Sequence, residues 1–197
     1  LLQGEDANLY FLPAEIAGKG TITPLEVTIS FQVEDKVYDQ NNTATIGEFS
    51  FENAPLPGNP NLQIMVSNAQ YSSKNVGNRQ VIVQEWSIEG EKRNNFIFTF
   101  ADNVYGEIFP KEVELSFSAD TKVYDGTTTA EVDEFNFSPE LFIGDEFSIN
   151  YSAANFVDSN SSLNKIVELS DITYSGDDAA NYSVIFLEGK GNILPKI

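Results

Sequence analysis

The sequence predicts an all-β protein built from two tandem antiparallel β-sandwich repeats that form an extended rod. Three observations lead to this prediction. A Lys-Val-Tyr-Asp…Thr-Ala pattern stands at residues 36–44 and returns at 122–130, an offset of 86 residues. Segments with alternating apolar residues occur in the same order in both copies, separated by turn-forming Gly, Pro, Asn and Asp every ~8–12 residues. No window of the sequence has a convincing helical period.

The repeat period divides the chain into two units, residues 25–110 and 111–197, each the size of a small domain. Residues 1–24 resemble the end of such a unit, because 4–10 are similar to 176–182 and 18–24 are similar to 189–195. We therefore expect residues 1–24 to be the C-terminal strands of a preceding repeat, within a protein that contains a longer array.

Each unit is expected to contain about six strands, identified by apolar residues at every second position. In the two units these strands are expected at 25–33 and 113–117, 45–51 and 131–137, 62–66 and 147–151, 80–88 and 165–174, 96–100 and 182–186, with closing strands that reach Ile108 and Ile193. Pro24 and Pro110 directly precede the first strands, so the connection between units is short and stiff, which favours a rod.

Strand number and spacing favour a sandwich that is immunoglobulin-like in the broad sense. A β-grasp-like sheet is the alternative, but it requires a helix that the pattern does not show. A single helical turn around residues 68–75 or 153–160 is compatible with either fold.

The composition excludes several classes of function. The chain carries 30 acidic and 11 basic residues, a formal net charge of −19, which opposes binding to nucleic acid and to anionic membrane surfaces. It contains no Cys and no His, so disulfides, thiolate nucleophiles, imidazole bases and the usual zinc ligands are absent. No apolar run is long enough to span a membrane. We predict a protein that is not an enzyme, since no carboxylate pair or phosphate-binding loop stands in a catalytic motif.

The repeated signature is interpreted as a structural turn. In the second copy, Asp125-Gly126 supplies the positive φ angle of a tight turn, and the Asp side chain can bond to an amide two residues on. Tyr124 is expected to lay its ring over the end of the core and to direct its hydroxyl to a backbone partner.

The first copy of the signature has Tyr38 and Asp39, but Gln40 replaces the glycine and two asparagines follow. Asparagine tolerates left-handed geometry, so the turn is expected to survive in altered form. A ligand-binding triplet would not tolerate Gln40, and this substitution favours a turn over a binding site.

Four motifs together resemble the YDG and MBG-type tandem repeats of large bacterial surface proteins, such as adhesins and filamentous-haemagglutinin-like exoproteins. The motifs are Lys122–Thr128, Asn75-Val76-Gly77, Gly176–Tyr182 and Gly106–Pro110. The resemblance covers essentially the whole chain. It implies an extracellular stalk or spacer segment at the surface of a bacterium, with neighbouring repeats of the same chain as partners and no catalytic residues.

The sequence departs from this family pattern at three places. These are Gln40 for glycine, Ser161-Ser162 in place of Val-Gly, and Glu91–Phe96 in place of the Asp-Ala…Asn-Tyr motif. The departures affect individual turns.

Two binding hypotheses stay open beside the spacer interpretation. Calcium could bind acidic loops, although no spacing matches a known calcium loop and solvated turn acids are expected there. The candidate ligands are Asp120 and Asp125, Asp177 and Asp178, and Glu34, Asp35 and Asp39.

The alternative function is a carbohydrate- or protein-binding module that recognises a host or cell-surface glycan or protein. Trp86 could form part of a stacking platform for such a ligand. However, Trp86 lies in an alternating run and aligns with Ile172, which favours a place in the core. A spacer should lack a pocket lined with exposed aromatic side chains, whereas a binding module should have one.

Overall fold

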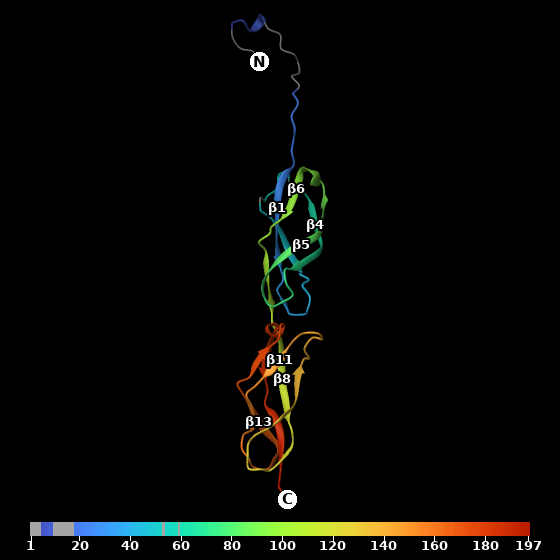
Figure 1. Ribbon diagram of the computed structural model, residues 1–197. Helices are drawn as coiled ribbons and strands as arrows, with labels where there is room; N and C mark the ends of the chain where they lie inside the picture. Colours follow the sequence, from blue (N-terminus) through green and yellow to red (C-terminus); the bar gives the residue numbers. More distant parts are fainter. Residues whose placement is uncertain (1–4, 10–17, 53, 59) are drawn as a thin grey trace.

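The structure is a computed structural model that describes residues 5–9, 18–52, 54–58 and 60–197, and it contains two elongated β-rich repeats placed end to end (Figure 1). The first repeat contains β1 (Leu25–Val33), β2 (Lys36–Val37), β3 (Ile46–Phe51), β4 (Leu62–Tyr71), β5 (Gly77–Gly90), β6 (Phe96–Phe100) and β7 (Tyr105–Phe109). The second contains β8 (Lys111–Ala119), β9 (Lys122–Val123), β10 (Val132–Ser138), β11 (Ser148–Asn150), β12 (Ala153–Phe156), β13 (Ser162–Ser170), β14 (Thr173–Ser175), β15 (Tyr182–Phe186) and β16 (Gly189–Leu194).

The two repeats follow the same order of strands. The long strands β4 and β5 of the first repeat are each divided in the second, into β11 with β12 and into β13 with β14. The remaining strands correspond one to one, so β8 matches β1, β15 matches β6 and β16 matches β7. The sequence prediction of an all-β fold in two tandem domains is confirmed.

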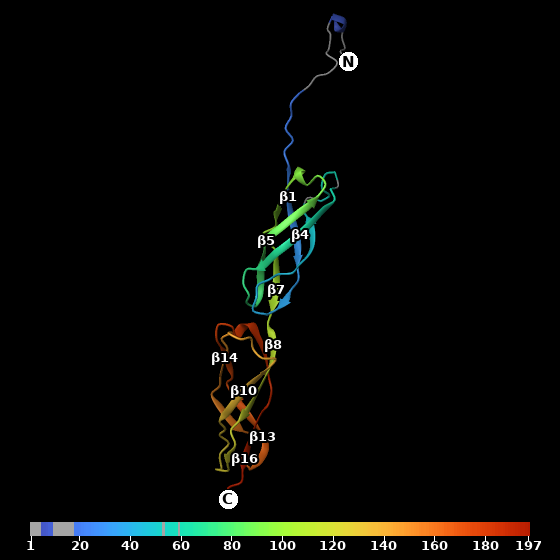
Figure 2. The same ribbon diagram turned by 90° about the vertical axis from the view of Figure 1, so that its right-hand side faces the viewer.

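Two sheets form the first repeat, with the orders β3-β1-β6 and β2-β7-β5-β4 (Figure 2). Alternate residues of β1 are buried, namely Val27, Ile29 and Phe31, which gives this strand one core face. In the second repeat β8 lies between β10 and β16, the sheet continues through β13 to β12, and β11 pairs with β14.

Parallel pairing is a feature that the sequence pattern did not predict. β1 pairs in parallel with β6, and β8 pairs in parallel with β15 at the equivalent place. The short strands β2 and β9 likewise run parallel to β7 and β16. Apolar alternation identifies the buried face of a strand, but it carries no information about the direction of the neighbouring strand.

No α-helix occurs in the described part of the chain, so the helix that the β-grasp alternative requires is not seen there, and none of the described helical turns could cross a membrane. The described residues include three short 3-10 turns, η1 (Ala7–Leu9), η2 (Arg93–Asn95) and η3 (Ala179–Asn181). The segments compatible with a helical turn, 68–75 and 153–160, instead contain parts of β4 and β12.

The turn η1 is relevant to the prediction that residues 1–24 are the end of a repeat. Its closing bond joins the amide of Leu9 to the carbonyl of Asp6 over 3.0 Å, and η3 has the same bond between Asn181 and Asp178 over 2.9 Å. Residues 1–4 and 10–17 lie outside the described residues, and residues 18–24 form no strand.

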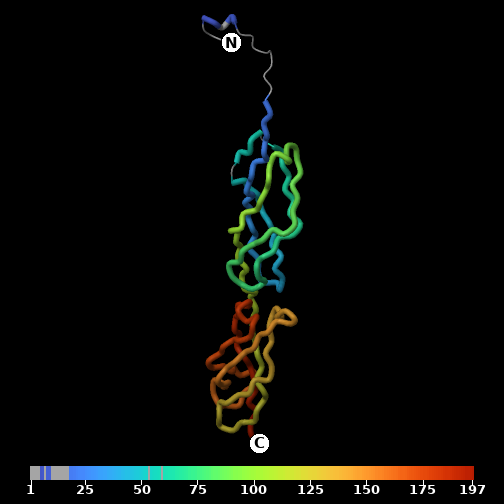
Figure 3. Tube along the Cα trace, turned by 45° about the horizontal axis from the view of Figure 1, so that its top comes forward, coloured from blue at the N-terminus to red at the C-terminus, as the bar shows by residue number. Residues whose placement is uncertain are grey.

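The two repeats are joined by one residue. β7 ends at Phe109 and β8 begins at Lys111, with only Pro110 between them, and the tube in Figure 3 passes from one repeat to the next without a loop. Lys111 is held by the second repeat, since its Nζ donates to the carbonyl of Glu140 over 2.9 Å and lies 3.8 Å from the ring centre of Phe142.

Candidate functional site

The signature turn has the same internal hydrogen bonds in both copies. In the first, Lys36 Nζ lies 2.7 Å from Oδ1 of Asp39, and the same oxygen accepts from the amide of Asn41 over 3.1 Å. Lys36 also donates to the carbonyls of Asn41 and Thr43, so one ammonium group holds the whole loop. Desolvation by burial raises the pKa of Asp39, but the bonds from Lys36 and Asn41 outweigh it and the pKa is lowered.

In the second copy, Lys122 Nζ lies 2.9 Å from Oδ1 of Asp125, which accepts from the amide of Thr127 over 2.9 Å. The Thr127 amide, followed by Lys122, lowers the pKa of Asp125 to about 2. Gly126 has a φ angle of 82°, and in the first copy Gln40 itself adopts 66°. The expectation that the following asparagines would adopt the left-handed geometry is therefore wrong, because Gln40 does so directly.

The two signature tyrosines are held alike but differ in exposure. The backbone amide of Tyr38 donates to Phe109 and that of Tyr124 donates to Leu194, both over 2.8 Å. The side chain of Tyr38 is nevertheless buried, at 2% exposure, whereas Tyr124 is 42% exposed. This difference arises because the second repeat covers Tyr38.

We call the surface of the first repeat that meets the second its trailing end, and the facing surface of the second repeat its leading end. The trailing end consists of Tyr38, Gln40, Lys74, Asn75 and Val76. The leading end consists of Phe142, Asp145, Asp178, Asn181 and Tyr182. Together they form the junction.

Tyr38 is inserted into the leading end. Its ring packs edge-on against the rings of Tyr182 and Phe142, with centroid distances of 5.7 and 5.9 Å. Its hydroxyl donates to Oδ2 of Asp145 over 2.9 Å. Residues of both repeats thus form one continuous apolar cluster, which also includes Phe31, Tyr71, Ile108 and Val113.

Asp145 is the acceptor at the centre of the junction, and its side chain is only 1% exposed. Besides Tyr38, it accepts from the hydroxyl of Tyr182 over 2.6 Å and from Nε2 of Gln40 over 2.7 Å. Burial by itself raises the pKa of Asp145, but these bonds and the charge of Lys74 outweigh burial, so the pKa lies below 3.8. Burial, followed by the bond to Asp145, raises the pKa of both tyrosines above 10.0.

A second acidic residue of the leading end faces the lysine of the trailing end. Lys74 Nζ lies 3.3 Å from Oδ1 of Asp178 and 3.8 Å from Oδ1 of Asp145. Asp178 also accepts from the amide of Glu146 and so connects two loops of the second repeat. Because both carboxylates are largely buried while Lys74 is 41% exposed, the lysine balances their charge from the rim.

Two family motifs that are about a hundred residues apart meet at the junction. Asn181, which is 2% exposed, accepts from the amide of Val76 over 3.0 Å through Oδ1. Its Nδ2 donates to Oδ1 of Asn75 over 3.3 Å. The Asn-Val-Gly of one repeat and the Asp-Ala…Asn-Tyr of the next are therefore complementary parts of one contact.

The structure separates the five residues predicted as a turn signature. Asp39, Asp125 and Gly126 lie in the turns, Tyr38 lies in the junction and Tyr124 is exposed. Tyr124, whose ring was expected to lie over the end of the core, is instead 42% exposed. The hydroxyl of its counterpart Tyr38 donates to a carboxylate of the next repeat.

Sequence reasoning also missed the partners of Tyr38 in the leading end. The signal in the sequence for these partners is the Asp-Ala…Asn-Tyr motif, which belongs to the surface that receives Tyr38.

Several of the acidic residues considered for calcium are paired with a basic side chain. Asp39, Asp125 and Asp178 each face a lysine. Within the described ranges, no group of three or more acidic side chains is placed to hold a metal ion.

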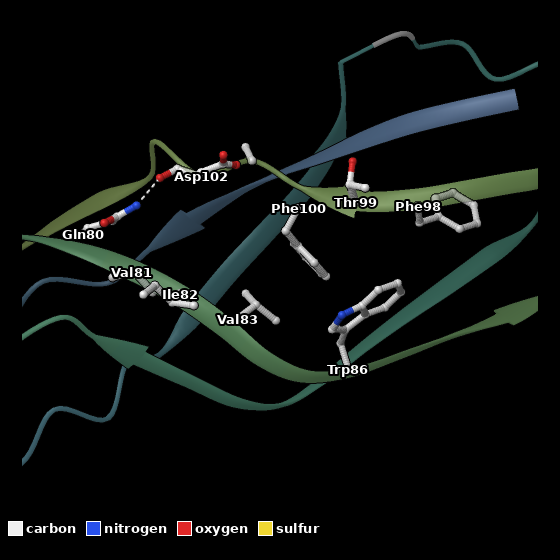
Figure 4. Close-up of a pocket in the computed structure, with 10 residues that line it drawn as sticks. Gln80, Val81, Ile82, Val83, Trp86, Phe98, Thr99, Phe100 and Asp102 are labelled. Atoms are coloured by element: carbon white, nitrogen blue, oxygen red, sulfur yellow. Dashed lines mark hydrogen bonds between the residues drawn. The ribbon is translucent and has the colours of Figure 1, made fainter.

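Trp86 lies in a cleft of the first repeat rather than in its core. The cleft has a volume of about 500 Å³ and lies between β5 and β6 (Figure 4). The indole is 38% exposed and meets the ring of Phe100 edge-on at 5.2 Å. Val83 and Phe98 contribute further apolar surface. The expectation that Trp86 is a core residue is therefore wrong. β7 pairs with β5 only from Gly77 to Gln80, so β7 does not extend the sheet as far as Trp86.

Comparison with known proteins identifies the repeat. No curated protein and no solved structure matches the chain. The sequence pattern that defines the YDG domain matches residues 23–103 and again residues 109–189. These two matches cover most of the chain, and each begins near the first strand of a structural repeat and ends before or at the start of its last strand. The chain therefore belongs to the YDG domain family.

Proposed function

We propose that this chain is a non-catalytic spacer segment of a large extracellular bacterial adhesin, in which stacked repeats hold a distal binding region away from the cell surface. The observation that carries the proposal is the insertion of Tyr38 into the leading end of the second repeat. A buried side chain with several partners across the boundary fixes the orientation of one repeat relative to the next. Flexibly tethered domains lack such contacts.

The covalent connection supports the same function. With only Pro110 between β7 and β8, the two repeats have little freedom to separate or rotate. The strands that enter and leave the junction run along the length of the repeats (Figure 1). A pulling force along the rod is therefore carried by the backbone and by the junction together.

The surface charge suits a projecting segment. A net charge of −19 makes neighbouring copies repel each other and opposes collapse onto an anionic cell surface. Lateral association of stalks would be weakest at low ionic strength, where repulsion is least screened.

The rigidity of the junction can be measured directly, because the chain contains no cysteine. Spin labels at Glu48→Cys and Glu134→Cys, two exposed equivalent positions, report one distance across the junction. We expect a narrow distance distribution that becomes broad in Tyr38→Ala and stays narrow in the matched control Tyr124→Ala. A broad distribution in the unaltered chain would disprove the spacer proposal.

The cellular location is tested separately. Antibodies raised against the chain should label intact bacteria that produce it, and protease added outside the cells should remove the label. Labelling only after the cells are permeabilised would contradict an extracellular position.

The Trp86 cleft favours a second candidate, a binding module for a glycan or a protein. Trp86, Phe98 and Phe100 line it, whereas the equivalent residues of the second repeat are Ile172, Val184 and Phe186. A glycan array should then give signals with the unaltered chain that disappear in Trp86→Ala. An array without signals for the unaltered chain would remove the glycan form of this candidate.

A further inference from the structure

We infer that the exposed trailing end of the second repeat, around Tyr124, is a docking surface for one more YDG repeat, and that it selects a leading end of the kind that the first repeat carries. The inference rests on the proposed spacer function and adds which type of neighbour the surface accepts.

The surface is the counterpart of an interface that is already formed. A hollow of about 540 Å³ is lined by Tyr124, Asn160, Ser161, Pro195, Lys196 and Ile197. The equivalent residues of the first repeat are Tyr38, Asn75, Val76, Pro110, Lys111 and Glu112, which belong to the junction or to its connection.

The loop that presents Tyr124 already has the form seen at the junction. Lys122 holds Asp125, as Lys36 holds Asp39, and the amide of Tyr124 is bonded to the closing strand as in the first copy. Docking of a neighbour would therefore bury the tyrosine without refolding the loop. Such preorganisation lowers the entropic cost of the contact.

The charged part of the junction is missing from this second trailing end. Gly126 stands where Gln40 donates to Asp145, and Ser159 stands where Lys74 faces Asp145 and Asp178. A leading end with both carboxylates would keep the tyrosine hydroxyls as donors, but it would bury its two charges here without a balancing lysine, which is unfavourable.

The leading end of the first repeat lacks the same charges. Asn59 and Lys92 stand at the positions of Asp145 and Asp178 in the sequence. The apolar residues that receive the signature tyrosine have apolar counterparts in the first repeat. Leu56 and Phe96 correspond to Phe142 and Tyr182, and both are buried.

The asparagine contact is kept as well. Asn95 corresponds to Asn181, and Asn160 corresponds to Asn75. The leading end of the first repeat (the first-type end) and the trailing end of the second repeat therefore keep the residues that make the apolar and asparagine contacts. The first lacks the two carboxylates, and the second lacks the glutamine and lysine that face them. These features make the first-type end the better fit.

The test lengthens the full chain by a third repeat directly after Pro195, which is equivalent to Pro24 and Pro110. One version adds residues 25–110, and the matched version adds residues 111–197. In both, the signature tyrosine of the added copy is changed to phenylalanine, so that its peptides are distinguishable. Hydroxyl-radical oxidation followed by mass spectrometry then measures the reactivity of Tyr38 and Tyr124 in one sample.

In the original chain, Tyr124 should be oxidised readily and Tyr38 should be protected. Adding the first-type repeat should lower the rate of Tyr124 to that of Tyr38, whereas adding the second-type repeat should leave Tyr124 reactive. Gly126→Gln combined with Ser159→Lys should restore protection by the second-type repeat.

A reactive Tyr124 beside the first-type repeat, or equal protection by both types, would overturn the inference. Either result with Tyr38 still protected leaves the spacer proposal intact. A reactive Tyr38 in the original chain would instead refute the junction on which both rest.

Discussion

The hydroxyl of Tyr38 donates a hydrogen bond of 2.9 Å to Oδ2 of Asp145, which belongs to the following repeat. This bond connects the signature turn of one repeat to a loop that stands more than a hundred residues later in the chain. The signature that marks the start of a repeat in the sequence thus acts, in the folded chain, on the neighbour of that repeat.

Removal of this hydroxyl should destabilise the junction. In Tyr38→Phe the ring still packs, but Asp145 loses one of its donors while it stays buried. A hydrogen bond to a charged group contributes about 2 kcal/mol, so the free energy of unfolding in urea should fall by about that amount. Tyr124→Phe is the matched control and should change it by less than about 0.5 kcal/mol, because Tyr124 is exposed. Equal effects of the two substitutions would contradict the assigned junction.

Acidification should loosen the junction through Asp145. The pKa of this carboxyl is below 3.8 in the folded chain, so its stabilising contribution is complete above 3.8 and is lost as the pH falls through the lowered value. The distance distribution between labels at Glu48→Cys and Glu134→Cys should therefore stay narrow from pH 7 to about pH 4 and broaden below that. In Asp145→Asn this dependence should be much weaker, and an unchanged acid transition in that variant would assign the effect to other carboxyl groups.

The left-handed position of the signature turn should distinguish the two copies. Gly126 has a φ angle of 82° and open space around its α-carbon, so Gly126→Gln adds backbone strain without a clash. We expect a loss of about 1 kcal/mol in the second repeat, measured by thermal or urea unfolding. Gln40 adopts the same geometry but gains its bond to Asp145, which offsets this strain. A Gly126→Gln variant as stable as the parent would show that the turn tolerates any side chain.

Asn181 should contribute more to the free energy of unfolding than Asn95, its counterpart in the first repeat. Asn181→Ala leaves the amide of Val76 without its acceptor inside the junction, which should cost about 2 kcal/mol. Asn95→Ala removes an exposed side chain and should change stability by less than about 0.5 kcal/mol. The two midpoints of unfolding in urea provide the comparison, and an Asn95→Ala effect as large as that of Asn181→Ala would argue against a junction role.

The sequence alone determined the repeat period, the all-β class and the family. These features follow from local chemistry: alternating apolar residues identify a strand with one buried face, and Gly, Pro and Asn identify the turns between strands. The similarity between residues 36–44 and 122–130 then showed that one unit occurs twice. Gly90 and Gly176 illustrate the local character of such signals, since each stands at the end of a strand with a positive φ angle, 138° and 118°, which larger residues rarely adopt.

Only the tertiary structure decided what the signature contacts. Tyr38 and Tyr124 stand in the same Lys-Val-Tyr-Asp sequence and have the same backbone bonds, yet one is buried and the other exposed, because burial depends on whether another repeat lies against the turn. The parallel pairing of β1 with β6 and the open cleft at Trp86 also depend on how strands assemble in space. Contacts between residues far apart in the chain leave no periodic trace in the sequence, and for that reason the junction became visible only in the folded protein.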